Sequence, residues 1–220
     1  MTIINKQEII QKTKKFVKNK LEGEGSGHDW QHVERTWKNA ILIGKSEDVD
    51  MFIVELAALL HDIADWKFCN GDETVGPKIA TDFLLELNVP EKTADHVAQI
   101  IKDISYKGQE TKTAMQTKEG KVVQDADRLD AIGAIGVARV FAYGGHKNRE
   151  IYNPAVKPQV YKTAEEYKNN KSTAINHFYE KLLLLKDRMN TKTGKIIAEQ
   201  RHLFMQNFLK QFYQEVEGKL

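Results

Sequence analysis

The chain has 220 residues, and its 33 lysines and arginines nearly balance its 31 aspartates and glutamates, which leaves a formal net charge of +2. This balance gives no argument for a nucleic-acid polymer or a membrane as partner, and the length suffices for one sizeable core. A single cysteine, Cys69, excludes an internal disulfide and fits a reducing compartment. Because we find neither a signal-peptide pattern nor a run of about 20 apolar residues, we expect a soluble cytoplasmic protein.

Hydrophobic periodicity predicts helices throughout the chain, and no segment shows the sustained two-residue alternation of a strand. Residues 5–21 predict an amphipathic surface helix, and Trp30 to Gly44 predict a second one. Residues 56–60 are apolar on every side. They therefore predict a buried core helix, for which Asp48 or Asp50 can serve as the N-cap.

The middle of the chain continues in helices. We expect one that begins near Pro77, another that begins at Pro90, and a third from about Glu119 to Tyr143. Gly133 and Gly136 lie inside the third, where a glycine costs about 1 kcal/mol relative to alanine. These two glycines therefore suggest that another helix approaches closely.

The last third begins with a polar segment, residues 146–171, whose length suits a functional loop or a lid. Two long amphipathic helices over about 172–217 close the chain, the first of them around Ile175–Met189. Their large apolar side chains, Phe204 among them, are expected in the core. The pattern as a whole predicts an all-α fold, a single-domain helical bundle over residues 1–220.

The buried helix ends in an adjacent histidine and aspartate, His61 and Asp62. Burying a carboxylate without a partner costs several kcal/mol, whereas imidazole and carboxylate together suit a divalent cation. Taken alone, the pair is more typical of a helix end followed by a solvated turn. Upstream, however, His28, His32 and Arg35 recur at about one-turn spacing and can share one face of a helix.

The order His32, His61-Asp62 and Asp127 resembles the H…HD…D signature of the HD-domain metal-dependent phosphohydrolases. Three longer runs are similar to the small bacterial YpgQ/YedJ-like branch of that family: GHDWQHVER at 27–35, VQDADRLDAIGA at 123–134, and the block from His177 through Arg201. The resemblance covers nearly the whole chain, and it is highly specific.

This resemblance implies an HD-type bundle with a metal core at about 24–145 and the helices of 172–217 packed back over the site. It also implies that one divalent cation is bound by His32, His61, Asp62 and Asp127. Two imidazoles and two carboxylates form a mixed nitrogen and oxygen site that suits Mn²⁺ and can accept Mg²⁺, Fe²⁺ or Zn²⁺. His28 competes for the place of the first ligand, but the family pattern of a histidine followed three residues later by an arginine selects His32.

The resemblance names a third candidate catalytic residue beside His61 and Asp62. Related phosphohydrolases often carry an acidic residue three positions after the HD aspartate, where it orients or deprotonates the attacking water. Asp65 has that offset, although glutamate is commoner there, and the alternative is a surface carboxylate in a helical C-terminal turn.

HD-domain phosphohydrolases that bind two metals need further histidines before the last aspartate. This chain offers only His96 there, so a single metal is favoured.

A phosphorylated substrate also requires cationic partners. The candidate substrate-binding residues are Arg35, His28, His177, Lys181, Lys186 and Arg201. Lysines on an amphipathic helix are also typical of a solvated face, so the two lysines have a second explanation. Two further aspartates flank the last candidate ligand, Asp127. We interpret Asp130 as a partner for a ligand or for Arg128, and Asp125 as a solvated side chain.

The resemblance implies a metal-dependent phosphohydrolase that acts on nucleotides. The first hypothesis is a (deoxy)nucleoside triphosphate pyrophosphohydrolase that yields a nucleoside monophosphate and pyrophosphate. The alternatives are a 5′-nucleotidase, a triphosphohydrolase or a guanosine tetraphosphate hydrolase, and, from another class, a protein that binds metal and nucleotide without turnover. The expected partner is a nucleotide or another phosphorylated small molecule. Base and sugar preference, the physiological metal and the oligomeric state stay open.

Overall fold

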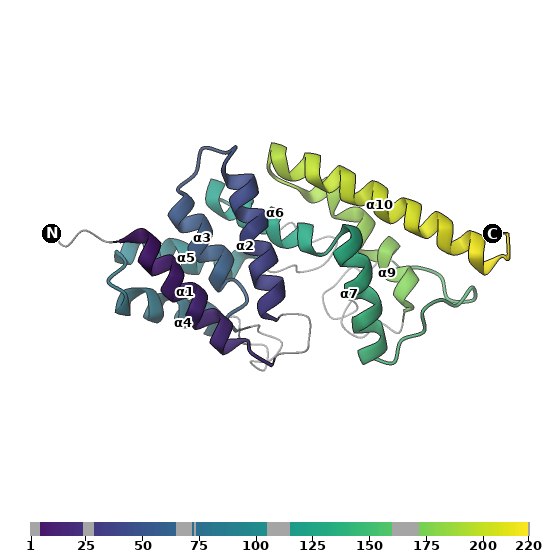
Figure 1. Cartoon of the computed structure of the whole chain (residues 1–220), viewed down its shortest axis with the longest axis horizontal. Helices are drawn as coiled ribbons and strands as arrows, with labels where there is room; N and C mark the ends of the chain where they lie inside the picture. The colour runs from purple at the N-terminus through teal and green to yellow at the C-terminus, as the bar shows by residue number, and fades with distance from the viewer. Residues whose placement is uncertain are drawn as a thin grey trace. The chain divides into compact units, whose positions relative to one another are not determined.

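The computed structural model describes residues 5–23, 29–64, 72, 74–104, 115–159 and 172–219. These residues fall into two compact units: the first holds the described residues up to Asp127, and the second holds those from Arg128 onward. Every regular element within the described ranges is helical (Figure 1), so the predicted all-α class is confirmed. The single domain over residues 1–220 stays a prediction. None of the described helices is both long and apolar enough to cross a membrane.

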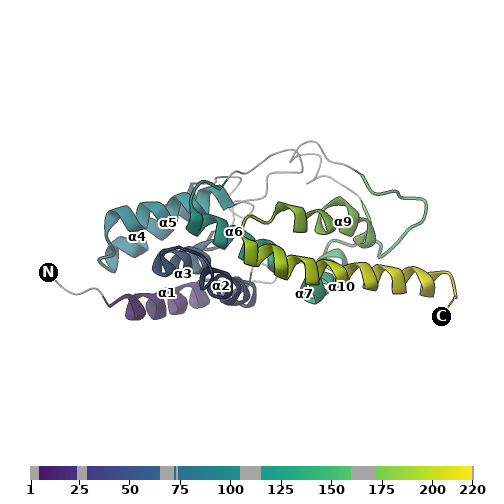
Figure 2. The same ribbon diagram turned by 90° about the horizontal axis from the view of Figure 1, so that it is seen from above.

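The first unit is built around helix α3. Its helices are α1 (Lys6–Lys20), α2 (Trp30–Gly44), α3 (Met51–Leu60), α4 (Val75–Glu86), α5 (Glu91–Ile104) and most of α6 (Lys118–Asp130). Helix α3 contacts α1, α2 and α5. Figure 2 shows it with α1 and α2 on one side and α4 and α5 on the other. Residues Leu56 to Leu60 are fully buried, as a helix that is apolar on every side requires.

The starts of α3 and α6 are tied to each other. Asp50 is the N-cap of α3, because its Oδ1 accepts the backbone N–H of Phe52 at 2.9 Å. Asp48, the other predicted cap, instead pairs with Lys118 Nζ at 2.7 Å. The backbone N–H of Asp50 donates to Glu119 Oε1 at 3.0 Å. Since Lys118 and Glu119 open α6, these contacts hold the beginning of α6 at the beginning of α3.

The single helix predicted from Glu119 to Tyr143 is wrong. Helix α6 ends at Asp130, and a separate helix, α7 (Gly133–His146), begins three residues later. Gly133 has a φ of +75°, in the left-handed region that residues with a Cβ rarely adopt. A Cβ at Gly133 would also lie 2.9 Å from the Cγ of Arg201. The glycine therefore permits both a sharp turn and the close approach of another helix, of which only the second was expected.

The second unit consists of α7, α9 (Ala174–Glu180), the 3₁₀ turns η2 (Leu182–Leu184) and η3 (Lys186–Arg188), and α10 (Lys192–Val216). Helix α7 contacts both α9 and α10. Phe141 of α7, Phe178 of α9 and Phe208 of α10 pack together with ring centroids 5.7 to 6.2 Å apart. These three rings form an aromatic centre that joins the three helices.

Two expectations for the last helices are wrong. The long helix predicted around Ile175–Met189 is a seven-residue α-helix followed by two 3₁₀ turns. The buried Leu182 and Leu185 are three residues apart, a spacing that a 3₁₀ turn satisfies as well as an α-helix does. Phe204 is 48% exposed and does not belong to the core, because it lies on the outer face of α10.

The polar segment predicted at 146–171 is described as far as residue 159, and residues 160–171 lie outside the described part. Its first half is bonded to α9. The backbone N–H groups of Ala174 and Ile175 donate to the carbonyls of Glu150 and Ile151 at 2.9 and 3.0 Å. Asn176 Nδ2 donates to the carbonyl of Val156 at 2.9 Å. Residues 150–156 are therefore attached to the beginning of α9.

Candidate metal centre

His32 lies in the first turn of α2. The N-cap residue, Asp29, accepts the backbone N–H of His32 through Oδ1 at 2.8 Å. The adjoining Trp30 and Val33 are buried, which anchors this turn in the first unit. As a result α2 begins with a buried imidazole that is only 2% exposed.

His61 and Asp62 follow the last turn of α3. His61 Nδ1 lies 2.9 Å from the carbonyl oxygen of Ala58. A carbonyl can only accept, so this contact places the imidazole proton on Nδ1 and leaves the lone pair of a neutral ring on Nε2. Histidines that bind metals are commonly oriented in this way by a carbonyl or carboxylate on the other ring nitrogen.

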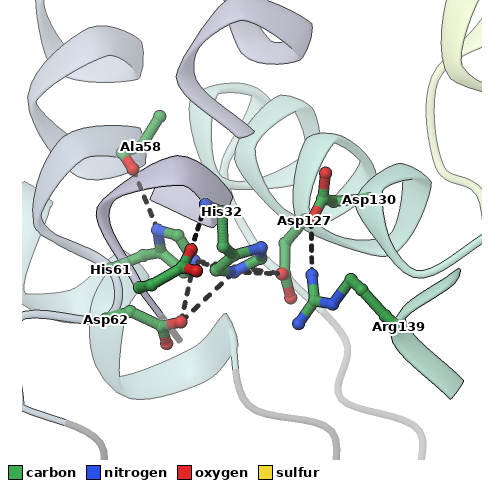
Figure 3. A network of polar contacts seen from close by, with 8 residues as sticks. His32, Ala58, His61, Asp62, Asp127, Asp130 and Arg139 are labelled. Carbon is green, nitrogen blue, oxygen red and sulfur yellow. Dashed lines mark hydrogen bonds and ion pairs between the residues drawn. The ribbon is translucent and has the colours of Figure 1, made fainter. Parts of the chain in front are cut away.

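The side chains of His32, His61, Asp62 and Asp127 point toward one another (Figure 3). The Nε2 atoms of the two histidines are 3.2 Å apart. Asp62 Oδ2 lies 3.2 Å from His32 Nε2 and 3.5 Å from His61 Nε2. Asp127 Oδ1 lies 3.5 and 3.8 Å from the same two nitrogens. Three helix ends or turns, from α2, α3 and α6, thus bring four donor atoms together within the first unit.

These distances suit one shared cation. Neighbouring ligands that bind a divalent ion at about 2.0–2.2 Å lie roughly 3.0–3.6 Å apart. The ligand atoms of His32, His61 and Asp127 all lie within 4.8 Å of one another, and no other group of this kind occurs in the described residues. A divalent ion would also balance the charges of the Asp62 and Asp127 carboxylates. Their side chains are only 15% and 36% exposed.

Two site residues named from the sequence, His28 and Asp65, lie outside the described residues. Arg35 is described: it is half-buried on α2, three residues after His32. His96, the one extra histidine considered for a second metal, is half-buried on α5, and its Nε2 lies 3.9 Å from Glu119 Oε2.

Of the two acidic residues that flank Asp127 along α6, Asp125 differs from the sequence interpretation. Asp125 is fully buried and not solvated, because α6 buries more than one of its faces. Asp130 is buried too, and its Oδ2 accepts a hydrogen bond from Nη1 of Arg139 on α7. Arg139 was not singled out in the sequence, since nine residues separate it from its partner and the break between α6 and α7 was not foreseen.

The remaining candidate substrate residues, His177, Lys181, Lys186 and Arg201, belong to the second unit. Burial lowers the pKa of His177 to about 3, with the charges of Lys181 and Arg149 acting in the same direction. Arg149 could not be singled out from the sequence, because it stands in an irregular segment without periodicity. Lys186 Nζ pairs with Asp187 at 3.0 Å and Glu199 at 3.6 Å.

Arg201, the last of these candidates, lies on α10. Its Nη1 donates to the carbonyl of Leu129 near the end of α6. Burial lowers the pKa of its guanidinium, although an arginine stays protonated in proteins. Arg201 therefore has a structural partner in the second unit, and a role in substrate binding stays a prediction.

Known proteins resemble this chain over most of its length. The HD domain family matches residues 29–132, a range that contains all four candidate ligands. YpgQ of Bacillus subtilis is 41% identical over 207 residues, which cover 92% of this chain and 91% of YpgQ.

Solved structures agree as well. An HD-superfamily hydrolase from Bacillus thuringiensis is 47% identical, with a TM-score of 0.77 over 97% of this chain and 99% of that one. The crystal structure of Bacillus subtilis YpgQ in complex with ADP gives a TM-score of 0.75 at 36% identity over the superposed chains, covering 96% of this chain and 100% of that one. The chain therefore belongs to the HD-superfamily hydrolases, as its sequence suggested, and it is a metal-dependent hydrolase.

Proposed function

We propose that the protein is a nucleotide phosphohydrolase, and specifically a pyrophosphohydrolase that cleaves (deoxy)nucleoside triphosphates to the monophosphate and pyrophosphate. The observation that carries the nucleotide assignment is the crystal structure of YpgQ in complex with ADP, because that chain matches this one over almost the full length of both. The choice of a triphosphate substrate, and of this bond, comes from the resemblance of the sequence to the YpgQ-like branch.

In this reaction the oxygen of a water molecule forms a bond to the α-phosphorus, and the bond from that phosphorus to the α,β-bridging oxygen breaks. Pyrophosphate leaves with the electron pair, and one proton of the water must be accepted by a base. We propose Asp65 as that base. It follows Asp62 by three residues in the sequence, the offset at which related phosphohydrolases carry an acidic residue.

We propose that His32, His61, Asp62 and Asp127 hold one divalent cation, with Mn²⁺ first and Mg²⁺, Fe²⁺ or Zn²⁺ as alternatives. Such a cation, when bound, would polarise a phosphoryl oxygen and lower the pKa of a bound water. The hydrogen bond from His61 Nδ1 to Ala58 supports this proposal, because it directs the Nε2 lone pair toward the other three donor atoms.

Charge on the substrate would be met by protein cations. We propose Arg35, Lys181, Lys186 and Arg201 as phosphate contacts, with His28 and His177 as further substrate contacts. His177 would act as a hydrogen-bonding group and not as a cation, since a pKa of about 3 keeps its imidazole neutral near pH 7. Its neighbours Lys181 and Arg149 would supply the positive charge.

The proposal is tested by identifying the products. The protein is stripped with chelator and incubated with a panel of nucleoside and deoxynucleoside triphosphates, with Mn²⁺, with Mg²⁺ or without metal. Phosphorus NMR then separates pyrophosphate, orthophosphate and triphosphate. We expect pyrophosphate and nucleoside monophosphate in equal amounts, and no turnover without metal.

Asp65→Asn should keep its metal and lose about 10²–10⁴-fold in kcat, the usual size of a general-base contribution.

Other outcomes would point elsewhere. Orthophosphate from monophosphates would indicate a 5′-nucleotidase, inorganic triphosphate would indicate a triphosphohydrolase, and pyrophosphate from guanosine tetraphosphate would indicate an alarmone hydrolase. A flat result across all nucleotides, with nucleotide binding retained, would leave a binding protein. Turnover of Asp65→Asn within a few-fold of wild type would remove Asp65 from the mechanism.

A further inference from the structure

We propose that Asp29 is a positioning residue of the metal centre, which holds the His32 imidazole in place through the first turn of α2. The inference rests on the metal site of the proposed function but concerns a residue outside the four ligands. Its basis is one contact: Asp29 Oδ1 accepts the backbone N–H of His32 at 2.8 Å.

The contact matters because His32 stands where a helix is weakest. The first four N–H groups of a helix have no partner within it, and helix ends open more readily than helix centres. The N–H of His32 is one of these four, and the side-chain bond from Asp29 satisfies it. This bond fixes the backbone directly beside the carbon that carries the imidazole.

The imidazole has little room for displacement. His32 Nε2 lies 3.2 Å from both His61 Nε2 and Asp62 Oδ2, and functional groups must be held within about 0.5 Å of their productive geometry. Outer partners that orient metal ligands typically contribute about 10- to 100-fold to metal affinity. We therefore expect loss of the Asp29 acceptor to weaken metal binding on that scale.

Loss of the cap should leave the fold in place. Trp30 and Val33, which flank the same turn, are buried in the first unit. Lys14 of α1 lies over the ring of Trp30, with Nζ 5.8 Å from the ring centroid. Packing therefore keeps α2 docked when the cap is removed, and the effect on His32 can be separated from unfolding.

The chain offers a matched control at the start of α1. Asn5 caps α1 in the same manner, because its Oδ1 accepts the backbone N–H of Glu8 at 3.2 Å. Helix α1 belongs to the same unit and carries no candidate ligand. Asn5→Ala thus removes an equivalent cap without touching the metal centre.

The test compares Asp29→Ala, Asp29→Asn and Asn5→Ala with the wild type in the full chain. Mn²⁺ affinity is measured by titration calorimetry on chelator-treated protein, and circular dichroism follows helix content and thermal unfolding of the metal-free form. Asp29→Ala should bind Mn²⁺ about 10- to 100-fold more weakly, and Asn5→Ala should bind within twofold of wild type. Asp29→Asn keeps an acceptor oxygen at the cap and should restore affinity to within a few-fold.

Each contrary outcome is distinct. Wild-type affinity in Asp29→Ala would overturn the inference and leave the metal centre intact. Equal losses in Asp29→Asn and Asp29→Ala would also overturn it, because the charge and not the cap would then matter. Absence of Mn²⁺ binding in the wild type would overturn the metal site itself. If Asp29→Ala unfolds, Asp29→Gly replaces it, since glycine at an N-cap preserves most helix stability without a side-chain acceptor.

Discussion

The surroundings of His177 and Lys186, two candidate substrate residues of the second unit, shift the pKa values of these side chains in opposite directions. His177 is placed so that protonation would bring a charge into a desolvated position near Lys181 and Arg149, and its pKa falls to about 3. Lys186 has the opposite surroundings, because its hydrogen bond to Asp187 raises its pKa. In the sequence, His177 and Lys186 stand nine residues apart. The lysine is charged near pH 7 in any case, and only the structure shows that the histidine is neutral there.

The shift at His177 has a consequence for stability. In the unfolded chain a histidine takes up its proton below about pH 6.5, whereas folded His177 does so only near pH 3. Between these values the unfolded state binds more protons, so His177 makes the protein less stable as the pH falls. Its contribution is fully present above the unfolded pKa and is lost toward pH 3, by up to about 1.4 kcal/mol per pH unit.

We therefore expect the free energy of unfolding of the metal-free wild type to fall by about 2 kcal/mol more than that of His177→Gln between pH 7.5 and pH 5.0. Urea unfolding at both pH values measures this difference. His146→Gln, which removes an exposed histidine at the end of α7, serves as the control and should behave as the wild type does. Equal pH dependence in wild type and His177→Gln would show that His177 is not desolvated in the folded protein.

At the scale of elements, the turn between α6 and α7 depends on one glycine. Gly133 combines a φ of +75° with a side chain of α10 at close range. An alanine there would be strained in the backbone and would also press on the stem of Arg201, which cannot move as freely as the guanidinium end can. Both effects act on α7, the helix that begins directly after the end of α6 that carries the candidate ligand Asp127.

Gly133→Ala is expected to destabilise the protein by about 1–3 kcal/mol, as left-handed strain and a steric clash together suggest. The matched control is Gly145→Ala in the same helix, where an added Cβ would meet nothing within 4 Å. This control should be neutral or should gain up to about 1 kcal/mol. Thermal or urea unfolding compares the two variants. A wild-type midpoint for Gly133→Ala would show that the turn does not need a glycine.

The elements also show what the sequence could and could not predict. The apolar stretch 56–60 predicted a buried helix because no arrangement leaves it a solvated face, and α3 confirms it. The break after Asp130 was missed because glycine supports both a crossing of helices and a turn. The 3₁₀ turns after α9 were missed for a similar reason, since leucines three residues apart fit two helix types.

The candidate metal site followed from sequence more fully than its surroundings did. Histidine and aspartate at motif positions predict candidate ligands, and the structure brings His32, His61, Asp62 and Asp127 together. The Asp29 cap was not assigned a role because an aspartate before a helix has many uses. The contact of His61 with the carbonyl of Ala58 could not be predicted, because every residue has a main-chain carbonyl whatever its side chain.

At the scale of the whole molecule, the proposed chemistry is divided between the two units. The four ligand candidates lie in the first, and four of the candidate substrate contacts lie in the second. The division allows metal binding and substrate binding to be tested separately. Loss of a candidate ligand should abolish both metal binding and turnover, whereas loss of a candidate substrate contact in the second unit, such as Lys181, should leave metal binding unchanged.

The central claim is that one divalent cation is held by these four residues and is required for hydrolysis. The most direct test is the Mn²⁺ content of wild type and Asp127→Ala, measured by mass spectrometry after gel filtration and beside the hydrolysis rate. Asp95→Ala, which removes an exposed carboxylate of α5, is the control. We expect about one Mn²⁺ per chain in wild type and control, a sharp loss of both metal and activity in Asp127→Ala, and unchanged helix content. Full metal occupancy and full activity in Asp127→Ala would contradict the site and would point to Asp125 or Asp130 instead.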